Sequence, residues 1–151
     1  MIRLRNTLLA LAGLALIGSS AIAAQTVVVE ANDRMQFSVN KIDAIAGSEL
    51  TIVLKNVGSM PKAAMGHNLV VLTKDANAMA FAQAAAASPA TEYLPPAMMD
   101  QIIAATKMLG PKEEETITFT VPSEPGEYVY LCSFPAHYIV GMKGILVVTA
   151  E

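Results

Sequence analysis

Short runs that alternate apolar with polar residues mark most of the chain after residue 24. The clearest run ends at Val121, where Ile117 and Phe119 alternate with three threonines. This period of two is typical of a strand with one buried face. Other strand-like runs cover 27–29, 35–39, 50–55, 68–73, 127–132 and 144–149. Turn-forming residues separate the runs. The pattern predicts an all-β domain, a Greek-key β-sandwich of about seven antiparallel strands.

The middle of the chain lacks this alternation. Residues 75–87 are rich in alanine and methionine and predict a helix that ends at Ser88-Pro89. A weaker helical pattern runs over 97–108, after two consecutive prolines. We therefore expect a helical excursion from the sandwich around 74–110. No internal repeat or linker divides the sequence, so we predict one domain, 25–151.

The first residues have the features of an export signal. Two arginines precede an apolar run over 8–17, and small residues follow over 19–24. This order predicts a signal peptide and a periplasmic location. Cleavage after Ala23 or after Ala24 fits the small residues, and we favour Ala24, which makes residues 1–24 the signal peptide and Gln25 the first mature residue. The alternative, a retained membrane anchor, is disfavoured because the apolar run is shorter than the roughly 20 residues of a spanning helix. We expect no stable membrane association after cleavage.

Charge and composition limit the class of partner. The formal net charge is −3, and it becomes −5 without residues 1–24, with eight Lys and Arg against thirteen Asp and Glu. Nucleic acid is therefore excluded as a partner, since phosphate binding needs a basic face. The chain is 54% hydrophobic. That share is enough to build the core of a single domain, and we expect a monomer.

The only cysteine and the only two histidines fall in a pattern that suits a metal. His137 lies five residues after Cys132, and Met142 lies five residues after His137. The three residues share one loop between two predicted strands, and His67 directly precedes another. A thiolate, two imidazoles and a thioether form a soft mixed donor set that suits copper in both oxidation states. A structural zinc site would take four strong ligands, usually with paired cysteines.

Other interpretations of these residues explain less. A buried cysteine can act as a small hydrophobe. Cys132 and His137 would also suit the nucleophile and base of a thiol hydrolase, but no orienting third group is evident, and Met142 and His67 stay unexplained. A copper chaperone or copper-storage protein is the stronger alternative, given nine methionines. Methionines in apolar contexts are more often core fillers.

At these residues the chain resembles a known family. The segments 132–137 and 142–144 resemble the ligand loop of azurin-type blue copper proteins, which are cupredoxins. The segments 61–68 and 32–37 resemble their first-histidine segment and an early strand. The step from His137 to the methionine is one residue longer than in typical azurins and is similar to the auracyanin spacing. The resemblance spans nearly all of the mature chain and is weak over 74–97.

The resemblance implies a ligand set and outer contacts. The copper ligands would be His67, Cys132 and His137, with Met142 on one axial side and the Gly66 carbonyl on the other. Asn68 would tie the two ligand loops together and donate its backbone N–H to the cysteine sulfur. Phe134 would offer a second N–H, and such contacts tune a redox potential.

The resemblance also implies a function. The protein would transfer single electrons by Cu(I)/Cu(II) cycling and would not itself be an enzyme. Its partners would be redox proteins such as c-type cytochromes or a nitrite reductase. We expect an apolar docking face around the copper loop, formed by Met35, Met65, Ala136 and Tyr138.

Overall fold

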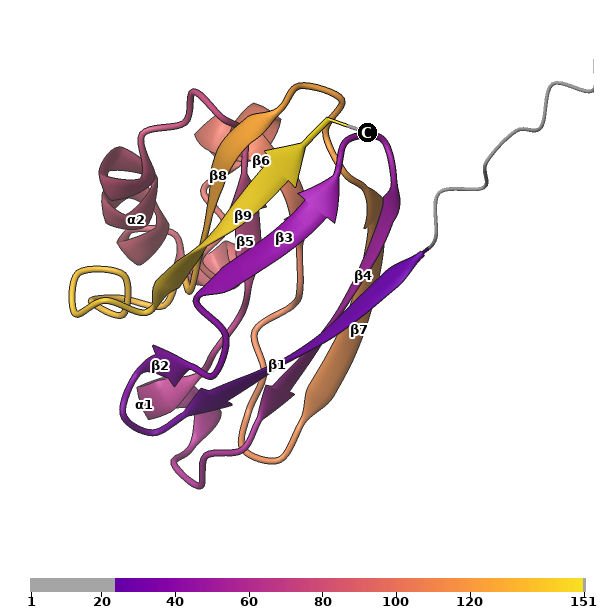
Figure 1. Cartoon of the computed structure of the whole chain (residues 1–151). Helices are drawn as coiled ribbons and strands as arrows, with labels where there is room; N and C mark the ends of the chain where they lie inside the picture. The colour runs from indigo at the N-terminus through magenta and orange to yellow at the C-terminus, as the bar shows by residue number, and fades with distance from the viewer. Residues whose placement is uncertain (1–23, 151) are drawn as a thin grey trace, which may run out of the picture.

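The computed structural model describes residues 24–150, and these form two facing β-sheets (Figure 1). The first sheet has the order β2-β1-β4-β7 and the second has the order β3-β9-β8-β5-β6. The strands of the first sheet are β1 (Gln25–Asn32), β2 (Gln36–Phe37), β4 (Glu49–Asn56) and β7 (Glu114–Thr120). The strands of the second sheet are β3 (Lys41–Ile45), β5 (Val70–Leu72), β6 (Ile102–Ala105), β8 (Gly126–Leu131) and β9 (Lys143–Thr149).

The alternation in the sequence determines which side chains fill the space between the sheets. On β4, Leu50, Ile52 and Leu54 are buried, while the residues between them are partly exposed. Burying side chains of this size stabilises the fold by about 1.5–3 kcal/mol each. Leu146 and Val148 contribute in the same way from β9. The predicted β-sandwich is confirmed.

The expectation of purely antiparallel sheets was wrong. β1 pairs parallel to β4 over seven residue positions, and β3 pairs parallel to β9 over five. Parallel neighbours need a crossover connection. Between β1 and β4 the chain passes through the second sheet as β3, and this excursion supplies the crossover. β3 itself was not predicted, although Ile42 and Ala44 are buried and alternate with exposed neighbours.

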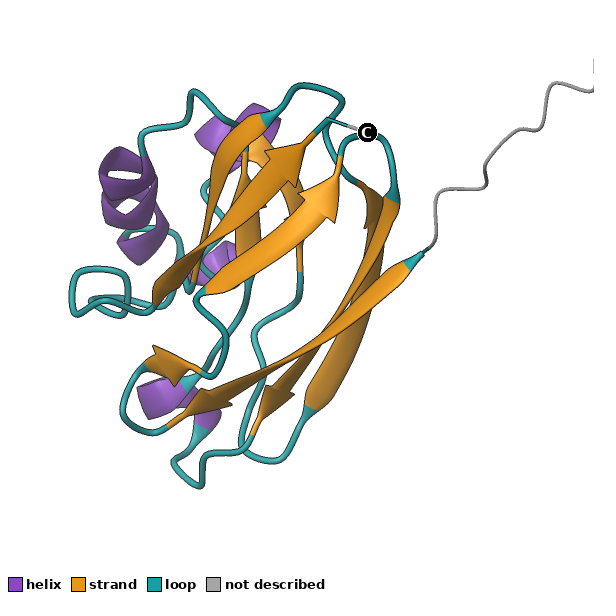
Figure 2. Ribbon diagram, in the orientation of Figure 1, coloured by secondary structure: helices purple, strands orange, loops and turns teal. Residues whose placement is uncertain are grey.

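The helical excursion is only partly helical. It contains α2 (Ala78–Ala86) and two 3-10 helices, η1 (Pro89–Thr91) and η2 (Pro96–Gln101). The Asn77 side chain accepts a hydrogen bond from the Ala80 N–H and so caps α2. Figure 2 shows α2 beside the second sheet, where Phe81 packs in a second apolar cluster with Leu72 and Leu131.

The second predicted helix, 97–108, was wrong beyond Gln101. The chain there forms β6 and pairs antiparallel with β5. Alanines 104 and 105 favour a helix locally, but the open edge of β5 offers hydrogen bonds that only an extended segment can make. Within residues 24–150, no helix is long and apolar enough to cross a membrane. The predicted signal peptide lies almost entirely outside the described residues.

Candidate metal centre

Antiparallel pairing brings the two predicted ligand loops together at the same end of the second sheet. β5 pairs with β8 so that Val70 faces Leu131. His67 lies just before the start of β5, and Cys132 lies just after the end of β8. Because the two strands run in opposite directions, the start of one and the end of the other are neighbours. The sheet therefore places two distant parts of the sequence side by side.

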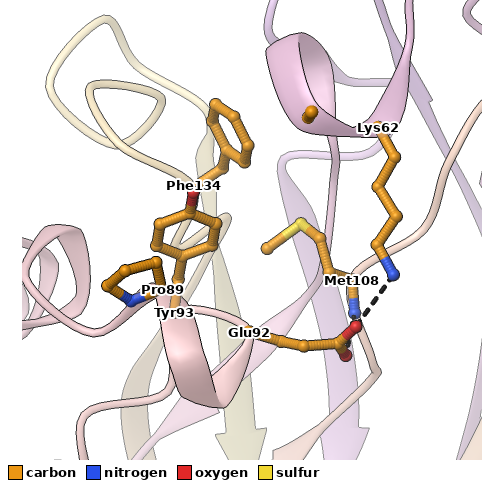
Figure 3. Close-up of a pocket in the computed structure, with 7 residues that line it drawn as sticks. Lys62, Pro89, Glu92, Tyr93, Met108 and Phe134 are labelled. Atoms are coloured by element: carbon orange, nitrogen blue, oxygen red, sulfur yellow. Dashed lines mark hydrogen bonds and ion pairs between the residues drawn. The ribbon is translucent and has the colours of Figure 1, made fainter.

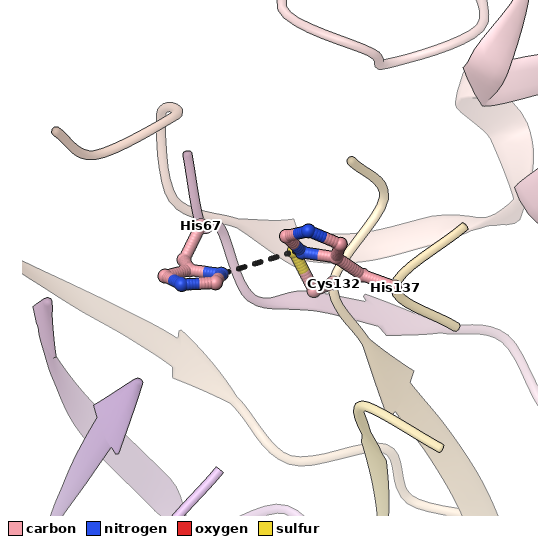
Figure 4. Close-up of side chains that lie close together, drawn as sticks. All are labelled: His67, Cys132 and His137. Atoms are coloured by element: carbon pink, nitrogen blue, oxygen red, sulfur yellow. Dashed lines mark hydrogen bonds between the residues drawn. The ribbon is translucent and has the colours of Figure 1, made fainter. Parts of the chain in front are cut away.

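Three of the predicted ligands converge on one point (Figure 4). The Cys132 Sγ lies 3.4 Å from the His137 Nδ1 and 4.0 Å from the His67 Nδ1. The three atoms all lie within 4.8 Å of one another, and all three residues are buried. A metal ion bound at about 2.0 Å to nitrogen and about 2.3 Å to sulfur holds the sulfur and a nitrogen about 3.5–3.7 Å apart, a value that lies between the two sulfur–nitrogen distances found here. The spacing therefore fits a single ion.

The loop from Cys132 to Met142 is closed by its own backbone. The Cys132 N–H donates to the Met142 carbonyl over 3.1 Å, and the Met142 N–H donates to the His137 carbonyl over 2.9 Å. Ala136 and Gly141 have positive φ angles of 70° and 105°, which let the loop turn back on itself. Met142 is fully buried in the same apolar cluster as Cys132. The loop thus keeps its three predicted ligands at one end of the sandwich.

Asn68 and Ser133 connect the two ligand loops. The Ser133 N–H donates to the Asn68 Oδ1, and the Asn68 Nδ2 donates to the Ser133 Oγ, each over 2.8 Å. The two residues continue the register of Val70 and Leu131 by two positions. Both side chains are buried, so losing either partner would leave an unsatisfied polar group. The predicted tie between the loops is confirmed, although Ser133 itself was not predicted as its partner.

A third segment supports the first histidine. His67 and Leu109 form an isolated bridge in which each N–H donates to the other residue's carbonyl, over 3.1 and 2.7 Å. Gly66 is buried, and a Cβ there would lie 2.8 Å from the Lys62 carbonyl oxygen and 2.9 Å from the Met108 Cγ. Only glycine fits so close an approach without displacing its neighbours. The contribution of 108–109 left no recognisable signal in the sequence.

Burial keeps the three donors neutral in the absence of metal. It raises the pKa of the Cys132 thiol to about 12, although the backbone N–H groups of Asn68 and Phe134 act in the opposite direction. These two groups are the N–H donors that the resemblance predicted for the sulfur. Burial lowers the pKa of His137 to about 4, with a smaller contribution from His67.

Burial also lowers the pKa of His67, and the Asn32 carbonyl and Asp33 partly offset this effect. The contact with the carbonyl falls short of a hydrogen bond, so the His67 Nε2 has no hydrogen-bond partner among the described residues. Both Nδ1 atoms face the sulfur. When a cation binds, the thiol would release its proton to solvent, and a thiolate beside two unprotonated imidazoles is a donor set that suits copper.

Comparison with known proteins identifies the family. The family model described as copper binding proteins, plastocyanin/azurin family, matches residues 23–149. The chain belongs to the plastocyanin/azurin family. Its cofactor is copper, and it is an azurin-like blue copper protein with a site of the His-Cys-His-Met type.

Curated relatives place it near the azurins. It is 45% identical over 122 residues to azurin-2 of Alcaligenes xylosoxydans xylosoxydans, covering 78% of this chain and 92% of the relative. It is 40% identical over 148 residues to an azurin of Achromobacter denitrificans, covering 92% of this chain and 97% of the relative.

Solved structures of the family confirm the cupredoxin fold. A dithionite-reduced auracyanin from Roseiflexus castenholzii matches with a TM-score of 0.73 and 34% identity, covering 87% of this chain and 99% of the auracyanin. An azurin from Methylomonas sp. strain J matches with a TM-score of 0.72 and 30% identity, covering 82% of this chain and 97% of the azurin. These matches agree with the resemblance to both azurins and auracyanins.

The surface around the copper loop is apolar, but not only at the predicted positions. Ala136 is exposed, whereas Met35, Met65 and Tyr138 are half-buried. Ile139 and Val140 are far more open, at 65% and 57% exposure. They lie on the part of the loop between His137 and Met142.

A chain of aromatic rings runs from the site towards the surface. The ring centroids of Phe134 and His137 are 4.7 Å apart, and those of Tyr93 and Phe134 are 5.1 Å apart.

Proposed function

We propose that this protein carries single electrons by cycling one bound copper ion between Cu(I) and Cu(II). His67, Cys132, His137 and Met142 would bind the ion, and the Gly66 carbonyl would be a further oxygen contact. The observation that carries the proposal is the convergence of one sulfur and two Nδ1 atoms within 4.8 Å in a buried cluster. Copper supplies the redox chemistry, and the chain's residues supply a fixed geometry.

The rigidity of the site supports electron transfer rather than catalysis. Hydrogen bonds join His67 to Leu109 and Asn68 to Ser133, so the two ligand loops cannot separate without breaking buried contacts. A geometry acceptable to both oxidation states keeps the reorganisation small when the electron moves. With four side-chain ligands the ion would keep no open position for a substrate. We therefore propose a carrier that is not an enzyme.

We further propose that the carrier works in the periplasm. Residues 1–24 would be the signal peptide, and Gln25 would be the first mature residue. In support, β1 begins at Gln25, which already pairs with Leu50 of β4. The partners would be redox proteins such as c-type cytochromes or a nitrite reductase, and the carrier would act as a monomer. They would approach the apolar surface around Ala136, Ile139 and Val140.

Cupric ion added to the purified, metal-free mature protein tests the proposal. We expect an intense blue thiolate-to-copper absorption band that is absent in Cys132→Ser. Exposed Met99 is a matched control, and Met99→Leu should leave the band unchanged. The reduced protein should give its electron to an oxidised c-type cytochrome and recover the band. A colourless protein that binds cuprous ion and passes it to a copper acceptor would contradict the proposal and favour the copper chaperone.

A further inference from the structure

Glu92 joins two segments that lie on either side of the first histidine. Its Oε1 accepts a hydrogen bond from the Lys62 Nζ over 2.8 Å, and its Oε2 accepts one from the Met108 N–H over 3.1 Å (Figure 3). Lys62 opens α1 (Lys62–Met65), the short helix directly before Gly66. Met108 lies directly before Leu109. One carboxylate therefore connects the segment before the first histidine with the segment that supports it.

Both hydrogen-bond partners of Glu92, Lys62 and Met108, also pack closely against Gly66. The Lys62 carbonyl oxygen and the Met108 side chain are the atoms that a Cβ at Gly66 would meet, at 2.8 and 2.9 Å. The next residue after Met108 forms the two-hydrogen-bond bridge to His67. A shift of Lys62 or Met108 would therefore move Gly66 and the histidine together. Glu92 therefore acts on the site through Lys62 and Met108, which pack against Gly66.

The backbone is strained where it presents this carboxylate. Glu92 and the next residue, Tyr93, have φ angles of 54° and 62°, a left-handed conformation that is unfavourable for residues other than glycine. The Glu92 N–H donates to the Pro89 carbonyl over 3.2 Å. Tyr93 places its ring against Phe134, which in turn lies against His137. The two strained residues thus contact both ligand loops, one through a carboxylate and one through a ring.

A simple surface ion pair explains only part of this arrangement. The Lys62 and Glu92 side chains are 45% and 46% exposed, and such pairs contribute little stability by themselves. The hydrogen bond to the Met108 N–H is different because it is part-buried and holds the backbone. Strain of this kind persists only where the surrounding contacts maintain it.

We propose that Glu92 and Tyr93 are positioning residues that hold Gly66 and His67 against the loop of Cys132 and His137. They thereby set the reduction potential of the copper. This inference rests on the proposed function. Loss of the Glu92 contacts would let the segment from Lys62 to His67 relax outward and alter the environment of the ion on the Gly66 side.

The direction in which each variant shifts the reduction potential shows whether Glu92 acts by positioning the site or only by its charge. If Glu92 acted only through its negative charge, Glu92→Ala would raise the reduction potential and Lys62→Met would lower it. If the two residues act through one shared contact, both changes shift the potential in the same direction. The double variant then differs little from Glu92→Ala. We expect a change of about threefold in the equilibrium constant with a reference couple, which is about 28 mV for one electron.

Two further variants complete the design. Glu92→Gln keeps an acceptor for the Met108 N–H but loses the acceptor that faces Lys62, so its potential should lie between those of wild type and Glu92→Ala. Glu124 pairs with Lys74 on the surface near the start of β8, at the opposite end of that strand from Cys132. Glu124→Gln therefore removes a comparable ion pair away from the site and should leave the potential unchanged.

A measurement on the copper-free protein does not depend on the metal. Amide hydrogen exchange at Met108 and His67 should become about tenfold faster in Glu92→Ala and stay unchanged in Glu124→Gln. Potential shifts of opposite sign for Glu92→Ala and Lys62→Met, or unchanged exchange rates, would overturn the inference while leaving a blue protein. A wild-type protein that never turns blue would instead overturn the proposed function.

Discussion

At the residue scale, the site depends on burial more than on charge. The Cys132 thiol is completely buried, and no carboxylate belongs to the cluster found within residues 24–150. Desolvation is therefore the largest influence on the pKa values of the sulfur and both imidazoles, and it keeps these groups neutral. A neutral cluster can be buried without a compensating ion, so the sandwich can fold before the metal binds. Copper then replaces only the thiol proton.

The lowered pKa of His137 predicts acid sensitivity of the copper-free protein. The pKa falls from 6.5 in the unfolded chain to about 4 in the folded one, so folding favours the neutral ring. The resulting stability is complete above pH 6.5 and is lost as the pH falls towards 4. At 1.36 kcal/mol per pH unit the loss is about 3 kcal/mol. Urea unfolding of copper-free wild type and His137→Gln at pH 7 and pH 4 measures it.

Comparing wild type with His137→Gln isolates the contribution of His137 to the pH dependence of stability. Groups far from His137 are common to both proteins, so their contributions cancel when the two pH profiles are subtracted. The free energy of unfolding should fall more steeply in wild type than in His137→Gln. Parallel profiles would show that His137 is protonated as easily in the folded chain as in the unfolded chain.

At the element scale, the central strands of the second sheet determine the site. β8 lies between β5 and β9, and its end carries Cys132, while β9 begins directly after Met142. Tyr130 on β8 lies across from Gly144 on β9. The ring occupies the space that a side chain at Gly144 would need, and its hydroxyl donates to the Val39 carbonyl over 2.7 Å. This pair keeps the two strands in close register beside the ligand loop.

A methyl group at Gly144 should therefore damage this part of the fold. Its Cβ would lie 2.1 Å from the Tyr130 Cζ, so Gly144→Ala must displace the ring and break its hydrogen bond. We expect a loss of about 2–4 kcal/mol in the free energy of unfolding, measured by urea denaturation. A second variant, Gly144→Ala with Tyr130→Val, should lose less than the sum of the two single changes. Additive losses would contradict the proposed clash.

At the scale of the whole molecule, a bound ion would connect parts of the chain that are about seventy residues apart in sequence. His67 precedes β5, Cys132 and His137 follow β8, and all three lie at one end of the sandwich. The sheets already hold these loops together, so the metal adds a further link to an existing arrangement. Binding should therefore stabilise the folded state without changing its shape.

Metal addition should raise the melting temperature. Copper at a thousandfold excess over its Kd contributes about 4 kcal/mol, which corresponds to roughly 10 °C or more for a domain of this size. Calorimetry with and without copper measures the shift, and Cys132→Ser should remove most of it. An equal rise in both proteins would mean that copper binds outside the predicted site.

Much of this protein was predictable because its signals are local. Alternating residues such as Ile117 and Phe119 predicted the strands, and the spacing of Cys132, His137 and Met142 predicted one loop with soft ligands. Local signals failed where pairing with a distant segment overrides the preference of the residues themselves. Alanines 104 and 105 indicated a helix, yet they form β6 because β5 has an open edge there.

The sequence alone therefore determined the sandwich, the choice of copper and the residues proposed to bind it, since these depend on residue type and on short segments that resemble a known family. The tertiary structure decided the parallel pairings and how the site is supported. Ser133 opposite Asn68, Leu109 beside His67, and Glu92 between Lys62 and Met108 are contacts between segments far apart in the chain. No short pattern encodes such contacts, because they exist only once the two sheets and the excursion have packed together.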